Sequence, residues 1–111
     1  MFPYMSRNVD GLRVATCVFE AACFHKSVRV ACRCGHEAFF QAHGLWWLFT
    51  QRRWSDEFRD MRERFFCIRC WTVQRTRERP RVIEASRKPV TYNLPMPDER
   101  EWKRALRRFR S

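Results

Sequence analysis

Four cysteines stand in two close pairs, and their spacing is the pattern in this chain that most strongly indicates chemistry. One residue separates Cys32 from Cys34, and two residues separate Cys67 from Cys70. The intervening segment is thirty-two residues long. Zinc prefers thiolate and imidazole ligands, and a structural zinc site usually has four of them. The two pairs therefore predict one zinc ion held by Cys32, Cys34, Cys67 and Cys70.

The first cysteine pair has an alternative ligand, whereas the second does not. Cys67 and Cys70 have the common C-x-x-C spacing, whereas Cys32 and Cys34 have the less common C-x-C spacing. His36 follows closely and offers an imidazole as an alternative ligand to one of those two cysteines. We expect the remaining two cysteines, at positions 17 and 23, to be free and partly buried, because a free cysteine behaves as a small hydrophobic residue.

A site closed by four thiolates is expected to have a structural role. A catalytic zinc keeps one coordination position open and works with a positioned acid or base. The three histidines, at positions 25, 36 and 43, form no triad with a recognisable nucleophile. We therefore predict that the protein is not an enzyme, that it has no catalytic residues, and that it takes no small-molecule substrate.

The charge of the chain indicates a polyanionic partner. The sequence has 111 residues and a formal net charge of +11, and arginine supplies most of the basic side chains. Such an excess favours nucleic acid, an anionic membrane or an acidic protein, and arginine is suited to bidentate phosphate recognition. We predict a nucleic-acid-binding protein with a regulatory role. The alternative is an adaptor whose basic surface docks on an acidic protein partner. The expected phosphate contacts are Arg52, Arg53, Arg59, Arg62, Arg104, Arg107 and Arg108.

The segments that must position the cysteines are predicted to be strands and short helices. Apolar or alternating runs predict strands at 12–19, 27–32, 37–41, 71–76 and 81–85. Between the cysteine pairs, we expect a break at 43–44, a helix over 45–53, and a second helix that Ser55 caps. The sequence thus predicts a single α+β domain over 1–111, with a loose arm at 1–10.

The last segment, 98–110, is predicted to be a basic amphipathic helix. Asp98 and Glu101 fit a capping-box-like start. Trp102, Ala105, Leu106 and Phe109 recur on one stripe, while most of the remaining positions are basic. Because amphipathic helices usually bury their stripe in the local core, we expect this helix to dock on its own domain.

The protein is predicted to be cytoplasmic and to make no contact with a membrane. The N-terminus lacks the basic start and long apolar run of a secretory signal. The longest apolar patch, 45–49, is far shorter than the about 18 residues that a membrane span needs. The reduced thiols of the cytoplasm favour metal binding over disulfides.

The cysteine motifs resemble those of small bacterial zinc-ribbon proteins. The resemblance covers roughly residues 28–76 and depends on Cys32-Arg33-Cys34-Gly35-His36 and on Cys67-Ile68-Arg69-Cys70. It implies two ligand-bearing knuckles that flank an insert, here a short helical one. Some such proteins are nucleic-acid-binding or transcription-associated modules. The chain departs from the usual first knuckle, because Ala31 stands where a C-x-x-C motif would have its first cysteine.

Overall fold

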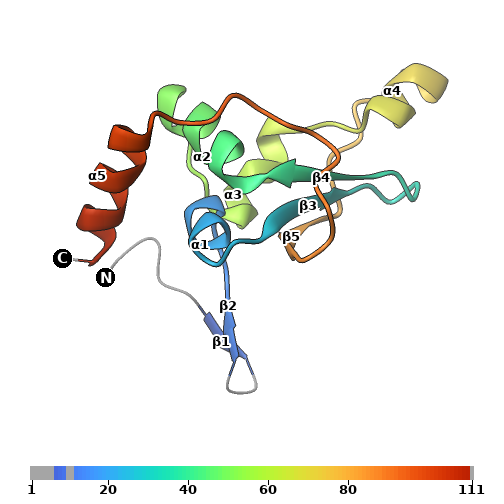
Figure 1. Cartoon of the computed structure of the whole chain (residues 1–111). Coiled ribbons are helices and arrows are strands. Elements are labelled where there is room, and N and C mark those ends of the chain that lie inside the picture. Colours follow the sequence, from blue (N-terminus) through green and yellow to red (C-terminus); the bar gives the residue numbers. More distant parts are fainter. Residues whose placement is uncertain (1–6, 10–11, 111) are drawn as a thin grey trace.

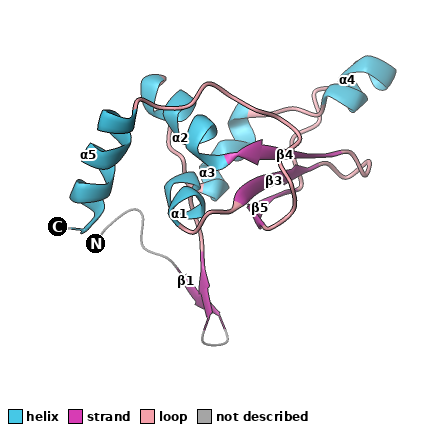
Figure 2. Cartoon of the chain, in the orientation of Figure 1, coloured by secondary structure: helices cyan, strands magenta, loops and turns pink. Residues whose placement is uncertain are grey.

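The protein has an α+β fold, seen in a computed structural model that describes residues 7–9 and 12–110 (Figures 1 and 2). A three-stranded antiparallel sheet has the strand order β4-β3-β5, and a separate pair joins β1 to β2. The strands are β1 (Arg7–Val9), β2 (Leu12–Val14), β3 (Ser27–Ala31), β4 (Glu37–Gln41) and β5 (Val82–Ser86). The helices are α1 (Val18–Cys23), α2 (Ala42–Gln51), α3 (Phe58–Met61), the 3-10 turn η1 (Arg62–Arg64), α4 (Ile68–Gln74) and α5 (Glu99–Arg110).

The central hairpin follows from the alternating pattern of its strands. Val28 pairs with Phe40 and Val30 pairs with Ala38, so these four side chains share one face of the sheet. Arg29 lies on the other face, where it forms ion pairs of 2.8 Å with Glu37 and with Glu84 of β5. The strands predicted at 27–32, 37–41 and 81–85 are thus confirmed to within one residue at their ends.

The strand predicted at 12–19 is wrong beyond Val14. β2 ends there, and residues 18–23 form helix α1. Five consecutive residues of α1, from Val18 to Ala22, are buried. A helix that is buried on all sides has no amphipathic period, so its sequence cannot be distinguished from that of a buried strand. Residues 7–9 of the predicted arm form β1, and the rest of that arm lies outside the described residues.

The hydrophobic core lies where α1 and α2 pack against each other and against the sheet. Its largest fully buried side chains include Phe49, Leu45 and Met61. Helix α5 covers the core from one side, because the Trp102 ring lies 5.2 Å from the rings of both Phe19 and Trp46. The predicted docking of this helix is therefore confirmed for Trp102, while the Phe109 side chain lies outside the described residues.

The predicted helix break at 43–44 is wrong, and the packing of Gly44 explains why. Helix α2 begins at Ala42 and runs through this glycine. A Cβ atom at Gly44 would lie 2.8 Å from the carbonyl oxygen of Leu94, in the connector before α5. The glycine thus lets the connector cross close to α2 and does not end the helix.

The second predicted helix is shorter than expected and has a different cap. Glu57 is the residue that precedes α3, and its backbone N–H donates to Ser55 Oγ. Ser55 in turn donates to Asp60 Oδ2. The prediction that Ser55 is the helix cap is therefore wrong, because Ser55 orders the turn before the helix.

The buried carboxylate of Asp56 fixes the start of α1 from a distant segment. Its Oδ2 accepts a hydrogen bond of 2.9 Å from the N–H of Phe19, and its backbone carbonyl accepts one from Val18. Only 6% of the residue is exposed. Burial raises the pKa of Asp56 from its ordinary value near 3.8 to about 6.

The replacement Asp56→Asn is expected to remove a pH dependence of stability. Because the folded state holds this proton more tightly than the unfolded state, Asp56 contributes stability below about pH 4 that is lost as the pH rises to about 6. The free energy of unfolding of the wild type should fall relative to that of the variant by up to roughly 3 kcal/mol across this window. Denaturant titrations of both proteins from pH 4 to pH 8 measure the difference. A difference that does not change with pH would contradict the assignment.

Candidate metal centre

The first cysteine pair lies in the tight turn that joins β3 to β4. The N–H of Cys32 donates to the carbonyl of His36 at 2.8 Å, and the N–H of Gly35 donates to the carbonyl of Cys32 at 3.0 Å. Gly35 has a φ of +97°, a conformation that side chains with a Cβ rarely adopt. This turn brings the side chains of Cys32 and Cys34 to the same side of the hairpin end.

The second cysteine pair lies at the start of helix α4. Cys67 is the residue that precedes the helix, and its Sγ accepts a hydrogen bond of 3.5 Å from the N–H of Cys70. The strand predicted at 71–76 is therefore wrong, since residues 71–74 continue this helix. Thr72 and Val73 favour strands by type, but both are exposed and neither pairs with another strand. The site joins one hairpin turn to one helix start, and only the first pair lies in a turn between strands.

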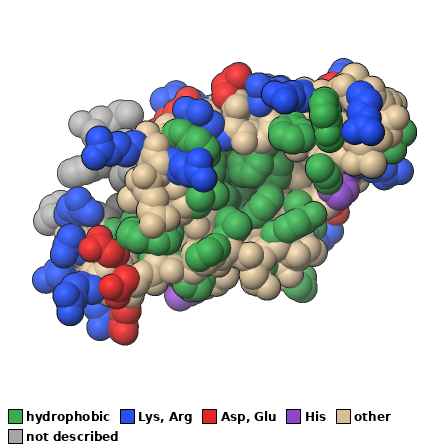
Figure 3. Space-filling model, turned by 90° about the horizontal axis from the view of Figure 1, so that it is seen from above, with side chains coloured by type: hydrophobic (Ala, Val, Ile, Leu, Met, Phe, Trp, Pro, Cys, Tyr) green, Lys and Arg blue, Asp and Glu red, His purple; other side chains and the backbone are tan. Residues whose placement is uncertain are grey.

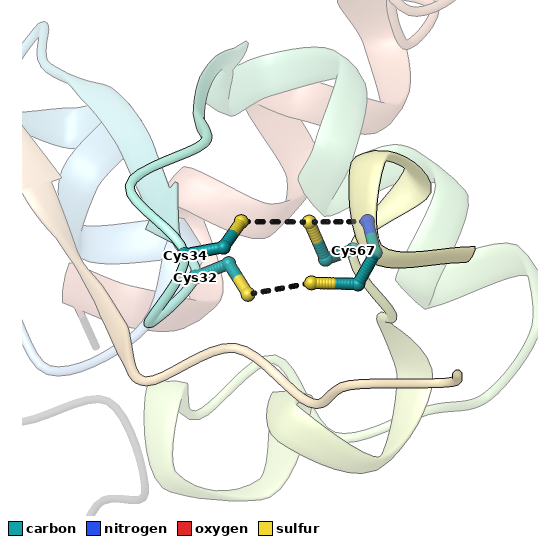
Figure 4. Close-up of side chains that lie close together, drawn as sticks. Cys32, Cys34 and Cys67 are labelled. Carbon is teal, nitrogen blue, oxygen red and sulfur yellow. Dashed lines mark hydrogen bonds between the residues drawn. The ribbon is translucent and has the colours of Figure 1, made fainter. Parts of the chain in front are cut away.

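The four sulfur atoms converge from these two elements (Figure 4). Cys32 Sγ lies 3.7 Å from Cys70 Sγ, and Cys34 Sγ lies 3.7 Å from Cys67 Sγ. All four lie within 4.8 Å of one another. A disulfide would require about 2.05 Å, whereas sulfurs arranged tetrahedrally around an ion at about 2.3 Å lie about 3.8 Å apart. The cluster therefore has the dimensions of a four-thiolate metal site and could hold a metal ion.

His36 contacts the cysteine turn through its backbone. Its carbonyl accepts a hydrogen bond of 2.8 Å from the N–H of Cys32. In the described part of the chain, the group of possible ligand atoms consists of the four cysteine sulfurs and does not include the imidazole of His36. The geometry thus favours four cysteines over the alternative that includes this histidine.

The thiols of the cluster differ in how readily they lose a proton. The backbone N–H of His36 lowers the pKa of Cys34 to about 7. Burial raises the pKa of Cys70 to about 12 and also raises that of Cys32. Because a metal binds thiolates, it would compete with protons for these sulfurs.

Cys17 and Cys23 are not joined in a disulfide, as predicted. Cys17 is fully buried in the core and lies 3.6 Å from Glu20 Oε1. Burial raises the pKa of the Cys17 thiol far above its ordinary value. A buried thiol of this kind is unreactive.

No family model, curated protein or solved structure matches this chain. The similarity of the cysteine motifs to zinc-ribbon proteins thus stays a prediction. In the part of the chain that the structure describes, no helix has the length and apolar character needed to cross a membrane.

The arginines predicted to contact phosphate differ in their contacts within the protein. Arg59 is paired with Glu57 at 2.9 Å, and Arg104 is paired with Glu101 at 3.3 Å. Arg62 donates to the carbonyl of Pro80. Arg53 and Arg107 are exposed. Arg108 is also exposed. Arg52, Arg53 and Arg107 have no carboxylate partner among the ion pairs that the described residues form.

Two aromatic clusters gather four arginines, three of which the sequence prediction missed. In the first, the Trp54 cluster, the guanidinium carbons of Arg52 and Arg64 lie 5.4 Å and 4.4 Å from the indole centroid. In the second, the Trp71 cluster, those of Arg75 and Arg77 lie 5.8 Å and 5.5 Å from the indole centroid. The spacing of Trp71 and Arg75, four residues apart at the end of a helix, is a sequence signal for such a contact.

Neither cluster is neutralised by an acidic side chain. None of the four arginines forms an ion pair within the described ranges, 7–9 and 12–110. Each cluster therefore brings two like charges to one aromatic ring, which favours an anion from outside the chain.

Proposed function

We propose that the four thiolates hold one zinc ion and that this ion has a structural role. The chemistry of the donor set supports zinc, which favours closed tetrahedral sites with sulfur ligands. The ion would join the β3–β4 turn to α4, the helix that carries Trp71 and ends at Arg75. Zinc would thus fix the Trp71 cluster in place. The reduced thiols that such a site needs fit a cytoplasmic protein.

The proposed activity is non-enzymatic binding of nucleic acid, in which the two arginine clusters contact phosphates. The observation that carries this proposal is the convergence of two unpaired guanidinium groups on each of two tryptophans. Arginine binds phosphate oxygens in pairs, and an indole ring beside the phosphate site can stack on a base. An acidic protein remains the alternative partner, since charge complementarity alone suits both.

Fluorescence anisotropy with labelled single-stranded and double-stranded DNA and RNA tests the activity. At low salt, the protein should bind at least one of these probes, and affinity should fall steeply as salt rises. The double variants R52Q/R64Q and R75Q/R77Q should each reduce the slope of log affinity against log salt by up to about 2 on duplex DNA, since each lost phosphate contact contributes about 0.9.

The matched control is R87Q/R100Q, which removes the same charge from two exposed arginines that have no aromatic partner in the described residues. This control should change the slope much less than either cluster variant. No binding to any probe at low salt, or an equal loss in the control, contradicts the proposal.

A further inference from the structure

An apolar hollow lies beside the metal centre; it shares Cys32 and Cys67 with the proposed zinc site and no residue with the arginine clusters. Its volume is about 270 Å³. The face seen in Figure 3 shows hydrophobic side chains gathered around a hollowed region, with Lys and Arg side chains at its margins. The side chains that form most of the wall are Val30, Ala38, Phe40, Phe65, Ile68 and Tyr92.

The hollow arises because the core covers only one end of the apolar sheet face. Val28, at the covered end, is fully buried in the core. Val30 and Ala38 lie farther along the same face, toward the turn that holds Cys32. The ring of Phe40 lies between two others, 5.5 Å from Phe65 and 5.3 Å from Tyr92. These rings close the sides of the hollow and leave its opening to solvent.

Large apolar side chains at the opening are exposed. The exposed fractions are 45% for Phe66, 51% for Ile68 and 46% for Tyr92. Contiguous exposed apolar surface at a concave site is typical of a binding site, because burying it on a partner is favourable. The hollow is therefore a candidate docking site.

Several arginines adjoin residues that line the hollow. Arg69 follows Ile68 and is exposed, and Arg81 follows the lining residue Pro80 and is exposed. Arg79 donates to the carbonyl of Phe65, which places a third arginine beside the wall. The lining residues include no carboxylate. A second copy of this chain, with its own charge of +11, would be repelled, whereas an acidic partner would be attracted.

The interior of the hollow favours an apolar side chain over a nucleobase. Its polar side-chain groups are His36, the Tyr92 hydroxyl and the two cysteines that face the metal centre. A base placed among the remaining apolar residues would leave several of its polar atoms without partners, which is costly. Leucine or phenylalanine side chains would meet no such cost.

We propose that the hollow binds an acidic segment of a partner protein that inserts apolar side chains. The acidic residues of the segment would face Arg69, Arg79 and Arg81, and its apolar residues would cover Ile68 and Tyr92. This proposal is independent of nucleic-acid binding, because the hollow and the two arginine clusters are different sets of residues.

The test uses the whole 111-residue chain and a fluorescein-labelled synthetic peptide in which Glu alternates with Leu and Phe. One comparison peptide has Ser in place of Leu and Phe, and another has Lys in place of Glu. The first peptide should bind, and both comparison peptides should bind much more weakly. Ile68→Ser should weaken binding about tenfold through lost apolar contact, as should Tyr92→Ser. The matched control is Val73→Ser, at a residue of the same helix that is 72% exposed and does not line the hollow; it should leave affinity unchanged.

The metal content of each variant shows that it is still folded at this end. Binding that is unaffected by both Ile68→Ser and Tyr92→Ser overturns the proposal. Equal binding of the Ser-substituted peptide would show simple charge attraction and also overturns it. The affinity of these variants for a single-stranded oligonucleotide is measured as well. If it falls as much as the affinity for the peptide, the hollow is part of the nucleic-acid site, and the proposal is overturned.

Discussion

Replacing Cys67 by Ser, or removing the metal with a strong chelator, is expected to unfold helix α4 and the turn at 32–36 while the core stays folded. The four sulfurs are the contacts that join these two elements at the end of the molecule away from α5 (Figure 1). Phe66, Ile68 and Val73 around them are exposed, so little apolar burial would replace the ion. Binding of structural zinc contributes many kcal/mol to the folding of the segment that it closes.

Amide hydrogen exchange measures this effect residue by residue. Without metal, the amides of α4 should exchange almost as fast as those of an unfolded chain, while the amides of α1 and α2 keep most of their protection. The matched control is Cys23→Ser, because Cys23 lies outside the cluster and forms no disulfide. That variant should bind one metal ion and keep the protection of α4. Unchanged protection of α4 after complete removal of the metal would contradict a structural role for the site.

Replacing Phe49 by Ala is expected to lower the free energy of unfolding by about 3–5 kcal/mol. Phe49 is only 2% exposed. Its ring lies 5.3 Å from Trp54 and 6.0 Å from Phe65, so it joins the core both to the Trp54 cluster and to the wall of the hollow. The cavity left by the ring would loosen both neighbours, and the proposed binding of nucleic acid by the Trp54 cluster should weaken.

Urea denaturation with the metal bound measures the stability difference. Phe66→Ala is the matched control, because it deletes the same ring from a position that is 45% exposed. The Phe66→Ala variant should lower the free energy of unfolding by about 1 kcal/mol or less. Similar losses in the two variants would contradict the core position of Phe49.

The sequence predicted those features that depend on short spacings. The two cysteine pairs were enough to identify the four candidate ligands. The two sulfurs of each pair are close together in the sequence, so local geometry alone can bring them to one side of the chain. The strands around Val28 and Phe40 were predictable because their alternation matches a sheet with one buried face. In the same way, the stripe that contains Trp102 predicted a helix that docks on the core.

The features that the sequence did not predict depend on contacts between distant segments. The sequence of helix α1 has no amphipathic period, because the helix is buried on all sides. Helix α4 contains residues that favour strands, and it begins directly after the candidate ligand Cys67. Gly44 predicts a helix break from the sequence alone, because the close approach of Leu94 to α2 at this residue is visible only in the structure. The Trp54 cluster brings Arg64 to a ring ten positions earlier in the chain, so residue types and spacing alone do not reveal it.

A structural ion at this position would connect two of the proposed binding surfaces. It would hold α4 against the hairpin, and α4 carries Trp71 of one arginine cluster and Ile68 at the opening of the hollow. The metal would then have no chemical step of its own. Its effect would be to keep two binding surfaces in a fixed arrangement.

X-ray absorption spectroscopy at the zinc edge, on freshly purified protein, tests the central claim most directly. We predict one zinc ion per chain with four sulfur neighbours at about 2.3 Å. A nitrogen neighbour at about 2.0 Å would point to a histidine such as His36 and contradict the four-cysteine site. Protein that contains no metal and has disulfides between these cysteines would contradict the claim altogether.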